Sequence, residues 1–268
     1  MWNTIVIGSG ISGLTAAAAL ARWGQRVLVL EQHRVAGGLT QAFRRHDWTF
    51  ATGVHYVSGV GPDPGADGQL GRMLQWLTDG ALQFAPCGNP YDHVRLPGFE
   101  FGIEHPQSAF RAALEARFPA RRAAIRAWFE QLDAASQSAR SLLVMRGLPG
   151  WLAWGWRLWN GAEIRRFSEQ TLGEALTAID DPHLRAVLGA RWGDYGSAPQ
   201  TAPLLEHALV TGAYDSGAYY PVGGPVRFAQ TLLPVIESAG GQVCLGADVE
   251  QIVATHGRAS AVVFEHAP

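Results

Sequence analysis

The chain has 268 residues, of which 47% are hydrophobic and 16% charged, and its formal net charge is -2. This composition is typical of a folded globular protein, and the length is sufficient for two modest domains. Because the chain has no excess of positive charge, nucleic acid is not expected as a partner. The two cysteines, Cys87 and Cys244, are far apart and belong to no CxxC pair, which argues against a disulfide framework or a metal site and favours a reducing, cytoplasmic location.

A nucleotide-binding fingerprint opens the chain. Residues 4–7 form a β-branched apolar run typical of a buried strand, a helix is predicted over 14–23, and a second strand over 26–30. The turn between the first strand and the helix reads GSGISG and contains Gly8, Ser9, Gly10, Ser12 and Gly13. This order of strand, glycine-rich turn, helix and strand indicates a Rossmann-like βαβ unit.

Each glycine of this turn has a role in the dinucleotide-binding pattern. Gly8 permits the tight turn, Gly10 lets a pyrophosphate approach the backbone, and Gly13 allows close packing of the helix on the strand. The helix N-terminus supplies free N–H groups for the phosphates. Glu31 ends the second strand, where it can accept hydrogen bonds from an adenosine ribose and repel a 2′-phosphate. The pattern predicts dinucleotide binding and leaves NAD and FAD both open.

The segment after Glu31 separates the two cofactors. A simple NAD domain would continue into another helix and strand, whereas this chain continues as HRVAGGLTQAF, with Gly37 and Gly38 in a loop. Here the sequence resembles the flavin-dependent amine oxidase and phytoene desaturase superfamily, whose second glycine pair brings backbone close to FAD. Two later stretches, WTFATGVHYVSGV at 48–60 and YYPVGGPVRFAQTLLPVIESAGGQV at 219–243, look like the branch of retinol saturases (all-trans-retinol 13,14-reductases) and carotenoid isomerases.

The resemblance implies a set of site residues. His55 would be a catalytic candidate close to the isoalloxazine ring, although a lone histidine in a β-like run is as often a hydrogen-bonded structural residue. Residues 221–224 suit either a turn or a cofactor contact. Leu39 and Ala51 depart from the family pattern, which has arginine and aspartate there. The residues implied to bind FAD are Gly8, Ser9, Gly10, Ser12, Gly13, Glu31, Gly37, Gly38, Thr40, Gly53 and, through its backbone, Val249.

The expected fold class is α/β, with a Rossmann-like FAD/NAD(P)-binding domain of the glutathione reductase type. We expect this domain to be discontinuous, formed by residues 1–70 and 219–268, because residues 242–245 are the first later segment able to supply a third strand. Residues 71–218 would form an inserted α+β, mostly helical domain that faces substrate or membrane. Apolar-polar alternation predicts a small antiparallel sheet there from residues 82–85, 91–96 and 99–103. Its helices are expected to have N-caps at Ser108, Thr171 and Asp181. In the resembled family more chain follows, so we expect the C-terminal part of the fold to be absent and a partner chain to be able to complete it.

The insertion contains WLAWGWRLW, residues 151–159, with four of the ten tryptophans of the chain and arginines around it. Three interpretations are open, namely a peripheral membrane anchor, the wall of an apolar substrate tunnel, and ordinary core packing. No apolar run reaches the roughly 20 residues needed to span a bilayer, and the first strand begins too close to Met1 to leave room for a cleavable signal. The chain is therefore expected to be soluble, with peripheral membrane contact at most.

The function that the resemblance implies is that of an FAD-dependent oxidoreductase. Its substrate would be an apolar polyene or isoprenoid of the retinoid or carotenoid kind, changed by saturation, desaturation or isomerisation of C=C bonds. One alternative is an NAD-linked dehydrogenase, against which the second glycine pair argues. Another is a non-catalytic or incomplete flavoprotein fragment that needs a partner chain.

Overall fold

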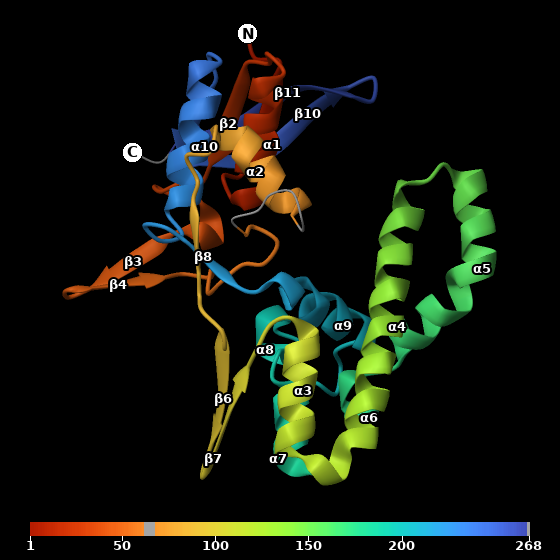
Figure 1. Ribbon diagram of the computed structural model, residues 1–268. Coiled ribbons are helices and arrows are strands. Elements are labelled where there is room, and N and C mark those ends of the chain that lie inside the picture. Colours follow the sequence, from red (N-terminus) through yellow and green to blue (C-terminus); the bar gives the residue numbers. More distant parts are fainter. Residues whose placement is uncertain (62–67, 267–268) are drawn as a thin grey trace. The chain divides into compact units, whose positions relative to one another are not determined.

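The structure, a computed structural model, describes residues 1–61 and 68–266 and divides into two compact units (Figure 1). The first unit is discontinuous and comprises Met1–Cys87 and Tyr219–Pro268. The second unit is the intervening Gly88–Ala218. Each unit has hydrophobic clusters of its own, one in the second unit and two in the first.

The second unit begins later than the expected insertion boundary at residue 71. The helix α2 (Gln69–Thr78) turns Leu74 and Leu77 inward, and both side chains are buried in clusters of the first unit. Burial of this apolar face keeps the helix with the nucleotide-binding fold. The return to the first unit at Tyr219 coincides with the expected position.

A three-stranded parallel sheet is the centre of the first unit. Its strand order is β1-β2-β9, formed by β1 (Thr4–Ile7), β2 (Val27–Glu31) and β9 (Gln242–Leu245). The helices α1 (Ile11–Arg22) and α10 (Arg227–Ser238) pack against each other beside this sheet, as Figure 1 shows, and their apolar faces join the buried Val27 and Val29 of β2. The prediction that residues 242–245 supply the third strand is confirmed.

Three antiparallel strand pairs complete the first unit. They are β3 (Ala42–Arg45) with β4 (Trp48–Ala51), β5 (Phe84–Pro86) with β8 (Tyr219–Pro221), and β10 (Ala247–Thr255) with β11 (Arg258–His266). Residues 82–85 were expected in a sheet of the insertion, and this expectation is wrong. The reason is packing, because the Phe84 ring lies 5.9 Å from that of Phe228 on α10 and joins a cluster of the first unit.

The second unit is mostly helical. Its hairpin of β6 (Asp92–Leu96) and β7 (Phe99–Ile103) packs Phe99, Phe101 and Ile103 into the helical core. The helices, in chain order, are α3 (Gln107–Arg117), η2 (Pro119–Arg121), α4 (Arg122–Gly147), α5 (Gly150–Glu169), α6 (Leu172–Leu176), α7 (Pro182–Gly189), α8 (Trp192–Tyr195), α9 (Leu204–Ala213) and η3 (Tyr214–Ser216).

Helix caps test the predicted helix starts of this unit. Thr171 forms a capping box with Glu174, and the side chain of Asp181 accepts hydrogen bonds from two backbone N–H groups, so both predicted N-caps are confirmed. Ser108 was expected to cap α3, but the helix begins at Gln107 behind Pro106, which places Ser108 inside the first turn. Within the described ranges, every helix is too short or too polar to cross a membrane.

Candidate functional site

The first glycine turn is shaped by backbone geometry that only glycine satisfies. Gly8 has a φ of +92°, in the left-handed region where other residues are strained. A Cβ atom on Gly13 would overlap the carbonyl oxygen of Gly8, so α1 can approach the end of β1 only without a side chain there. The structure therefore gives Gly8 and Gly13 the turn and packing roles expected from the sequence.

The N-terminus of α1 presents backbone N–H groups without a side-chain cap. Gly10 is the N-cap residue, and no acidic side chain lies in the first turn. The first bond within the helix runs from Leu14 N–H to Gly10 O at 2.9 Å, so the N–H groups of Ile11, Ser12 and Gly13 precede the intrahelical ladder. A Cβ built on Gly10 meets nothing within 4 Å. This combination of free donors, open space and helix dipole suits a phosphate group.

The second glycine pair lies directly beside the first turn. Gly37 and Gly10 form a parallel β-bridge, and Gly37 N–H donates to Ser9 O at 3.0 Å. A Cβ on Gly38 would come within 3.0 Å of Gly10 Cα. Gly37 and Gly38, with φ values of +117° and +55°, therefore allow two loops to run side by side with no side chain between them. Residues 8–13 and 37–38, which are at least 24 positions apart in sequence, thus form one continuous backbone surface, which we call the glycine cradle.

The Glu31 side chain holds the glycine cradle in place through hydrogen bonds. Its Oε2 accepts hydrogen bonds from Ser9 N–H at 2.7 Å and from Ser9 Oγ–H at 2.6 Å, while Oε1 accepts one from His33 N–H at 2.9 Å. Burial acts to raise the pKa of Glu31, but the bonds from Ser9 and His33 outweigh it and hold the pKa below its ordinary value. Glu31, only 5% exposed, is thus an anion that positions the loop, and its Oε1 retains a lone pair for a further donor.

The remaining expected site residues take different positions. The Thr40 hydroxyl is buried and donates to Gly37 O at 2.7 Å, so Thr40 stabilises the second glycine loop. Gly53 is exposed, and a Cβ there would lie 3.1 Å from Leu39 Cβ, which places Gly53 against the same loop. His55 is exposed between β4 and Val57.

Val249 is half-buried on β10, the strand that contacts β2. The start of β10 is fastened to the segment after β2 by a hydrogen bond from Gly246 N–H to His33 O at 3.0 Å. This bond brings the strand of Val249 close to the carboxyl end of β2, where Glu31 lies. Among the described residues, neither Val249 nor His55 forms a hydrogen bond with the two glycine loops.

The sequence alone did not indicate the network of Ser9, Glu31 and His33. The usable signal is the serine between the two glycines, because a short hydroxyl side chain there can reach the acid that ends the next strand. Across the part of the chain that the structure describes, no three His, Cys, Asp or Glu side chains gather as a metal-binding group.

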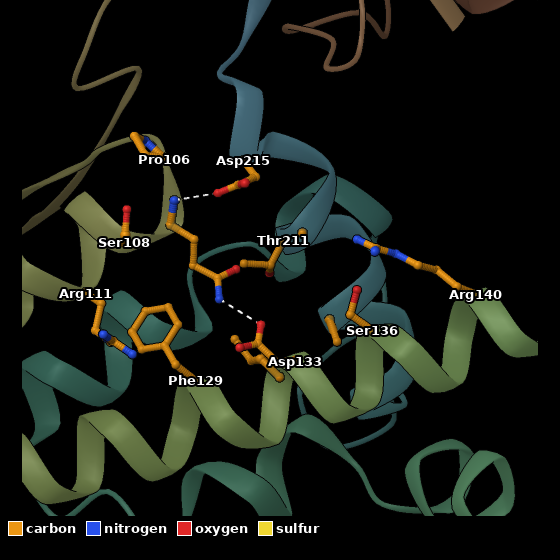
Figure 2. A pocket seen from close by; sticks show the side chains of 13 residues that line it. Pro106, Ser108, Arg111, Phe129, Asp133, Ser136, Arg140, Thr211 and Asp215 are labelled. Atoms are coloured by element: carbon orange, nitrogen blue, oxygen red, sulfur yellow. Dashed lines mark hydrogen bonds between the residues drawn. The ribbon is translucent and has the colours of Figure 1, made fainter. Parts of the chain in front are cut away.

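The second unit contains a polar cavity of about 360 Å³ between α3, α4 and α9, shown in Figure 2. Gln107 bridges two of its acids, donating from its backbone N–H to Asp215 Oδ1 at 2.7 Å and from Nε2 to Asp133 Oδ1 at 3.0 Å. Arg111 and Arg140 also line the cavity. Such charged walls do not suit an apolar polyene, because each polar group would lose its water without a replacement partner.

A buried polar network lies deeper in the second unit. The Arg191 guanidinium sits 4.4 Å from the ring centre of Tyr214. Burial lowers the pKa of His207 to about 4, so its ring is neutral at pH 7. Its Nε2 lies 3.1 Å from Leu188 O and its Nδ1 lies 3.0 Å from the Tyr195 hydroxyl. A neutral ring satisfies both contacts by donating from Nε2 and accepting at Nδ1, which indicates a structural role.

Comparisons with known proteins agree with this geometry. The family model for an NAD(P)-binding Rossmann-like domain matches residues 6–74. The chain is 34% identical to all-trans-retinol 13,14-reductase of Homo sapiens, over 94% of this chain and 42% of the relative. It is 27% identical to the chloroplastic prolycopene isomerase of Arabidopsis thaliana, over 98% of this chain and 45% of the relative. The chain thus spans less than half the length of the curated relatives that it matches.

Solved structures share the fold. An oxidoreductase from Methanosarcina mazei superposes with a TM-score of 0.63 at 18% identity, covering 98% of this chain and 56% of that one. Cyclohexylamine oxidase from Brevibacterium oxydans superposes with a TM-score of 0.58 at 18% identity, covering 93% of this chain and 52% of that one. The chain is therefore a homologue of the all-trans-retinol 13,14-reductases and prolycopene isomerases over the part of those proteins that it spans, and it contains an NAD(P)-binding Rossmann-like domain.

Proposed function

We propose that this chain is the nucleotide-binding part of an FAD-dependent oxidoreductase that acts on an apolar polyene. The observation that carries the proposal is the double glycine cradle, in which Gly10 and Gly37 lie side by side at the uncapped start of α1. A single glycine turn would suit many nucleotides, whereas the second loop supplies additional backbone beside the phosphate position.

The residues present fit the adenosine diphosphate part of FAD. The N–H groups at the start of α1, including that of Ser12, would bind the pyrophosphate, and Gly38 would let it approach. The free lone pair of Glu31 Oε1 would accept from the ribose, and its negative charge would disfavour a 2′-phosphate. We assign Val249 to the adenine side, and Gly53 and His55 to the flavin side.

The cofactor and the protein would contribute differently to the reaction. A bound flavin supplies hydride or electron transfer, with the protein providing orientation and electrostatics. This chain's own contribution is a cradle built from backbone, held in place by the Glu31 carboxylate through hydrogen bonds from Ser9 and His33. The retinol and prolycopene in the names of the relatives support a retinoid or carotenoid substrate, changed by saturation, desaturation or isomerisation of a C=C bond.

A second candidate is a fold completed by a partner chain. In the described part of the sheet β1 is an edge strand, and Ile7 at its end is exposed. Ile252, Val263 and Phe264 of the β10–β11 hairpin are exposed as well. An unpaired strand edge beside exposed apolar side chains favours the addition of a further strand.

The first experiment is an absorption spectrum of the purified chain after addition of FAD and gel filtration, and again after dithionite. A retained flavin band that bleaches on reduction supports the proposed cofactor, and retinoids and carotenoids are then screened as substrates. Retention of NAD but not FAD would support the NAD-linked dehydrogenase instead. A chain that retains neither and self-associates in light scattering would support the partner-chain candidate. Glu237→Gln, an exposed position on α10, is the matched control for variants of the cradle.

A further inference from the structure

The first half of α5 exposes its tryptophans instead of burying them. Trp159 is 91% exposed, Trp151 74% and Trp154 68%. The second half of the same helix buries Ile164 and Phe167 in the ordinary way. Core packing is therefore the wrong interpretation of this segment, and large apolar side chains left in water require another partner.

The end of α4 shares this exposure. Leu143 and Val144, in the last turns of α4, are exposed, and only Leu148 and Pro149 separate that helix from α5. Figure 1 shows α4 and α5 running antiparallel, so the exposed end of one helix lies beside the exposed start of the other. We call residues 140–166 the hairpin tip.

The apolar side chains of the hairpin tip point in more than one direction. At 100° per residue, Trp151, Trp154 and Leu158 fall on one side of α5, while Trp156 and Trp159 fall on another. A protein partner that packs in a groove covers one stripe of a helix. Exposure on two sides instead fits a medium that can surround the helix, such as the interfacial zone of a lipid bilayer.

The charge of the hairpin tip points to the same partner. Residues 140–166 contain five arginines and one acidic residue, Glu163, which gives a net charge of +4 in a chain whose total is -2. The arginines are Arg140, Arg146, Arg157, Arg165 and Arg166, all exposed. Within the described residues Glu163 pairs with Arg166 at 3.9 Å, and no ion pair engages the other four. Uncompensated cations among indoles are complementary to anionic lipid headgroups.

A groove on the hairpin tip combines both features. It measures about 650 Å³ and lies between α4 and α5, with Met145, Leu158 and Ile164 on its apolar walls. Arg157 and Arg165 also line it. Its lining thus offers apolar contact for an acyl chain next to cations for a phosphate.

We propose that the hairpin tip docks on the surface of an anionic bilayer. The indoles of Trp151, Trp154 and Trp159 lie at the headgroup level, and the arginines contact lipid phosphates. The helix lies in the interface and does not cross the membrane, in agreement with its polar content. This docking depends on the second unit alone and does not rest on the proposed cofactor or reaction.

The test is sedimentation of the full chain with phosphatidylcholine vesicles, with and without phosphatidylserine, over a range of salt concentrations. Wild-type protein is expected to bind the anionic vesicles, with affinity falling as salt rises. The double variant R157Q/R165Q is expected to lose about 30-fold in affinity for anionic vesicles. The double variant W154S/W159S is expected to lose at least about tenfold for both kinds of vesicle, because apolar contact is removed.

Matched controls lie in the first unit. Trp23→Ser removes an indole that is 72% exposed, and R44Q/R45Q removes two exposed arginines of β3, so both controls are expected to bind vesicles like the wild type. Circular dichroism checks that each variant is folded. Failure of the wild type to bind anionic vesicles at low salt would overturn the proposal. So would equal binding by W154S/W159S, or lipid-free self-association that this variant abolishes, since the occupant would then be a second copy of the chain.

Discussion

Replacing Glu31 with glutamine tests whether the carboxylate holds the glycine cradle in place. Glu31 accepts two hydrogen bonds from Ser9, at 2.7 and 2.6 Å, and one from His33 at 2.9 Å. Glutamine has a single acceptor oxygen, so either Ser9 or His33 would face an amide NH₂ group. Loss of one bond and of charge assistance in the others is expected to lower the free energy of unfolding by about 3 kcal/mol.

The assay is urea unfolding at pH 7, followed by circular dichroism, with Glu237→Gln in parallel. Glu237 is exposed on α10, so its replacement is expected to change the free energy of unfolding by less than about 0.5 kcal/mol. A loss below about 1 kcal/mol for Glu31→Gln would refute the reasoning, because charge-assisted bonds to a buried anion are worth more than that. Equal losses in the two variants would refute it as well.

The pH dependence of this difference follows from the lowered pKa of Glu31. Since the folded-state pKa lies below the ordinary value of 4.5, the unfolded chain takes up the proton first as the solution is acidified. The stability advantage of wild type over Glu31→Gln is therefore complete above pH 4.5. It declines as the pH falls through the folded-state pKa, and repeating the urea titration at several acidic pH values measures that decline.

Three further outcomes are expected. Gly13→Ala forces a Cβ against the Gly8 carbonyl, so it should lower the free energy of unfolding by about 2 kcal/mol in urea titration and weaken FAD retention after gel filtration. Thr171→Ala removes the capping box of α6 and should lower the free energy of unfolding by about 1 kcal/mol. Burial lowers the pKa of His207 to about 4, so the unfolded state takes up a proton at a higher pH than the folded state does. The stability of the wild type should therefore fall as the pH drops from 6.5 towards 4. Thermal unfolding of His207→Gln should show a shallower fall over the same range.

Local rules predicted the elements well because their causes are local. The β-branched run before Gly8 and the caps at Thr171 and Asp181 depend on neighbouring residues, and the structure places those elements where the sequence indicated. The third strand of the sheet was predictable as well, because few later segments were apolar and short enough. The pairing of β5 with β8 was not, since it joins segments more than 130 residues apart and depends on how Phe84 packs.

The candidate site divides in the same way. The glycines were recognisable because a position with a positive φ, or without room for a Cβ, requires glycine, and these positions lie at a fixed spacing from a strand. The direction in which a side chain points cannot be read from the sequence in this way. Ser9 and Glu31 were both candidates for ligand contact, yet the structure turns the Ser9 hydroxyl onto the Glu31 carboxylate, a partnership set by the parallel register of β1 and β2.

The proposed cofactor site is made mainly from backbone, so most substitutions of side chains would leave it intact. Backbone N–H groups are present whatever the side chain, so the proposed nucleotide site requires only that a few residues lack a side chain. The hairpin tip differs, because its contacts with lipid would come from indole and guanidinium side chains, so each substitution removes one contact. Cofactor retention should therefore respond to changes at Gly13 and not at Trp154, while vesicle binding should respond to Trp154 and not to Gly13. Measuring the two separately tests each proposal independently of the other, because each depends on a different unit of the fold.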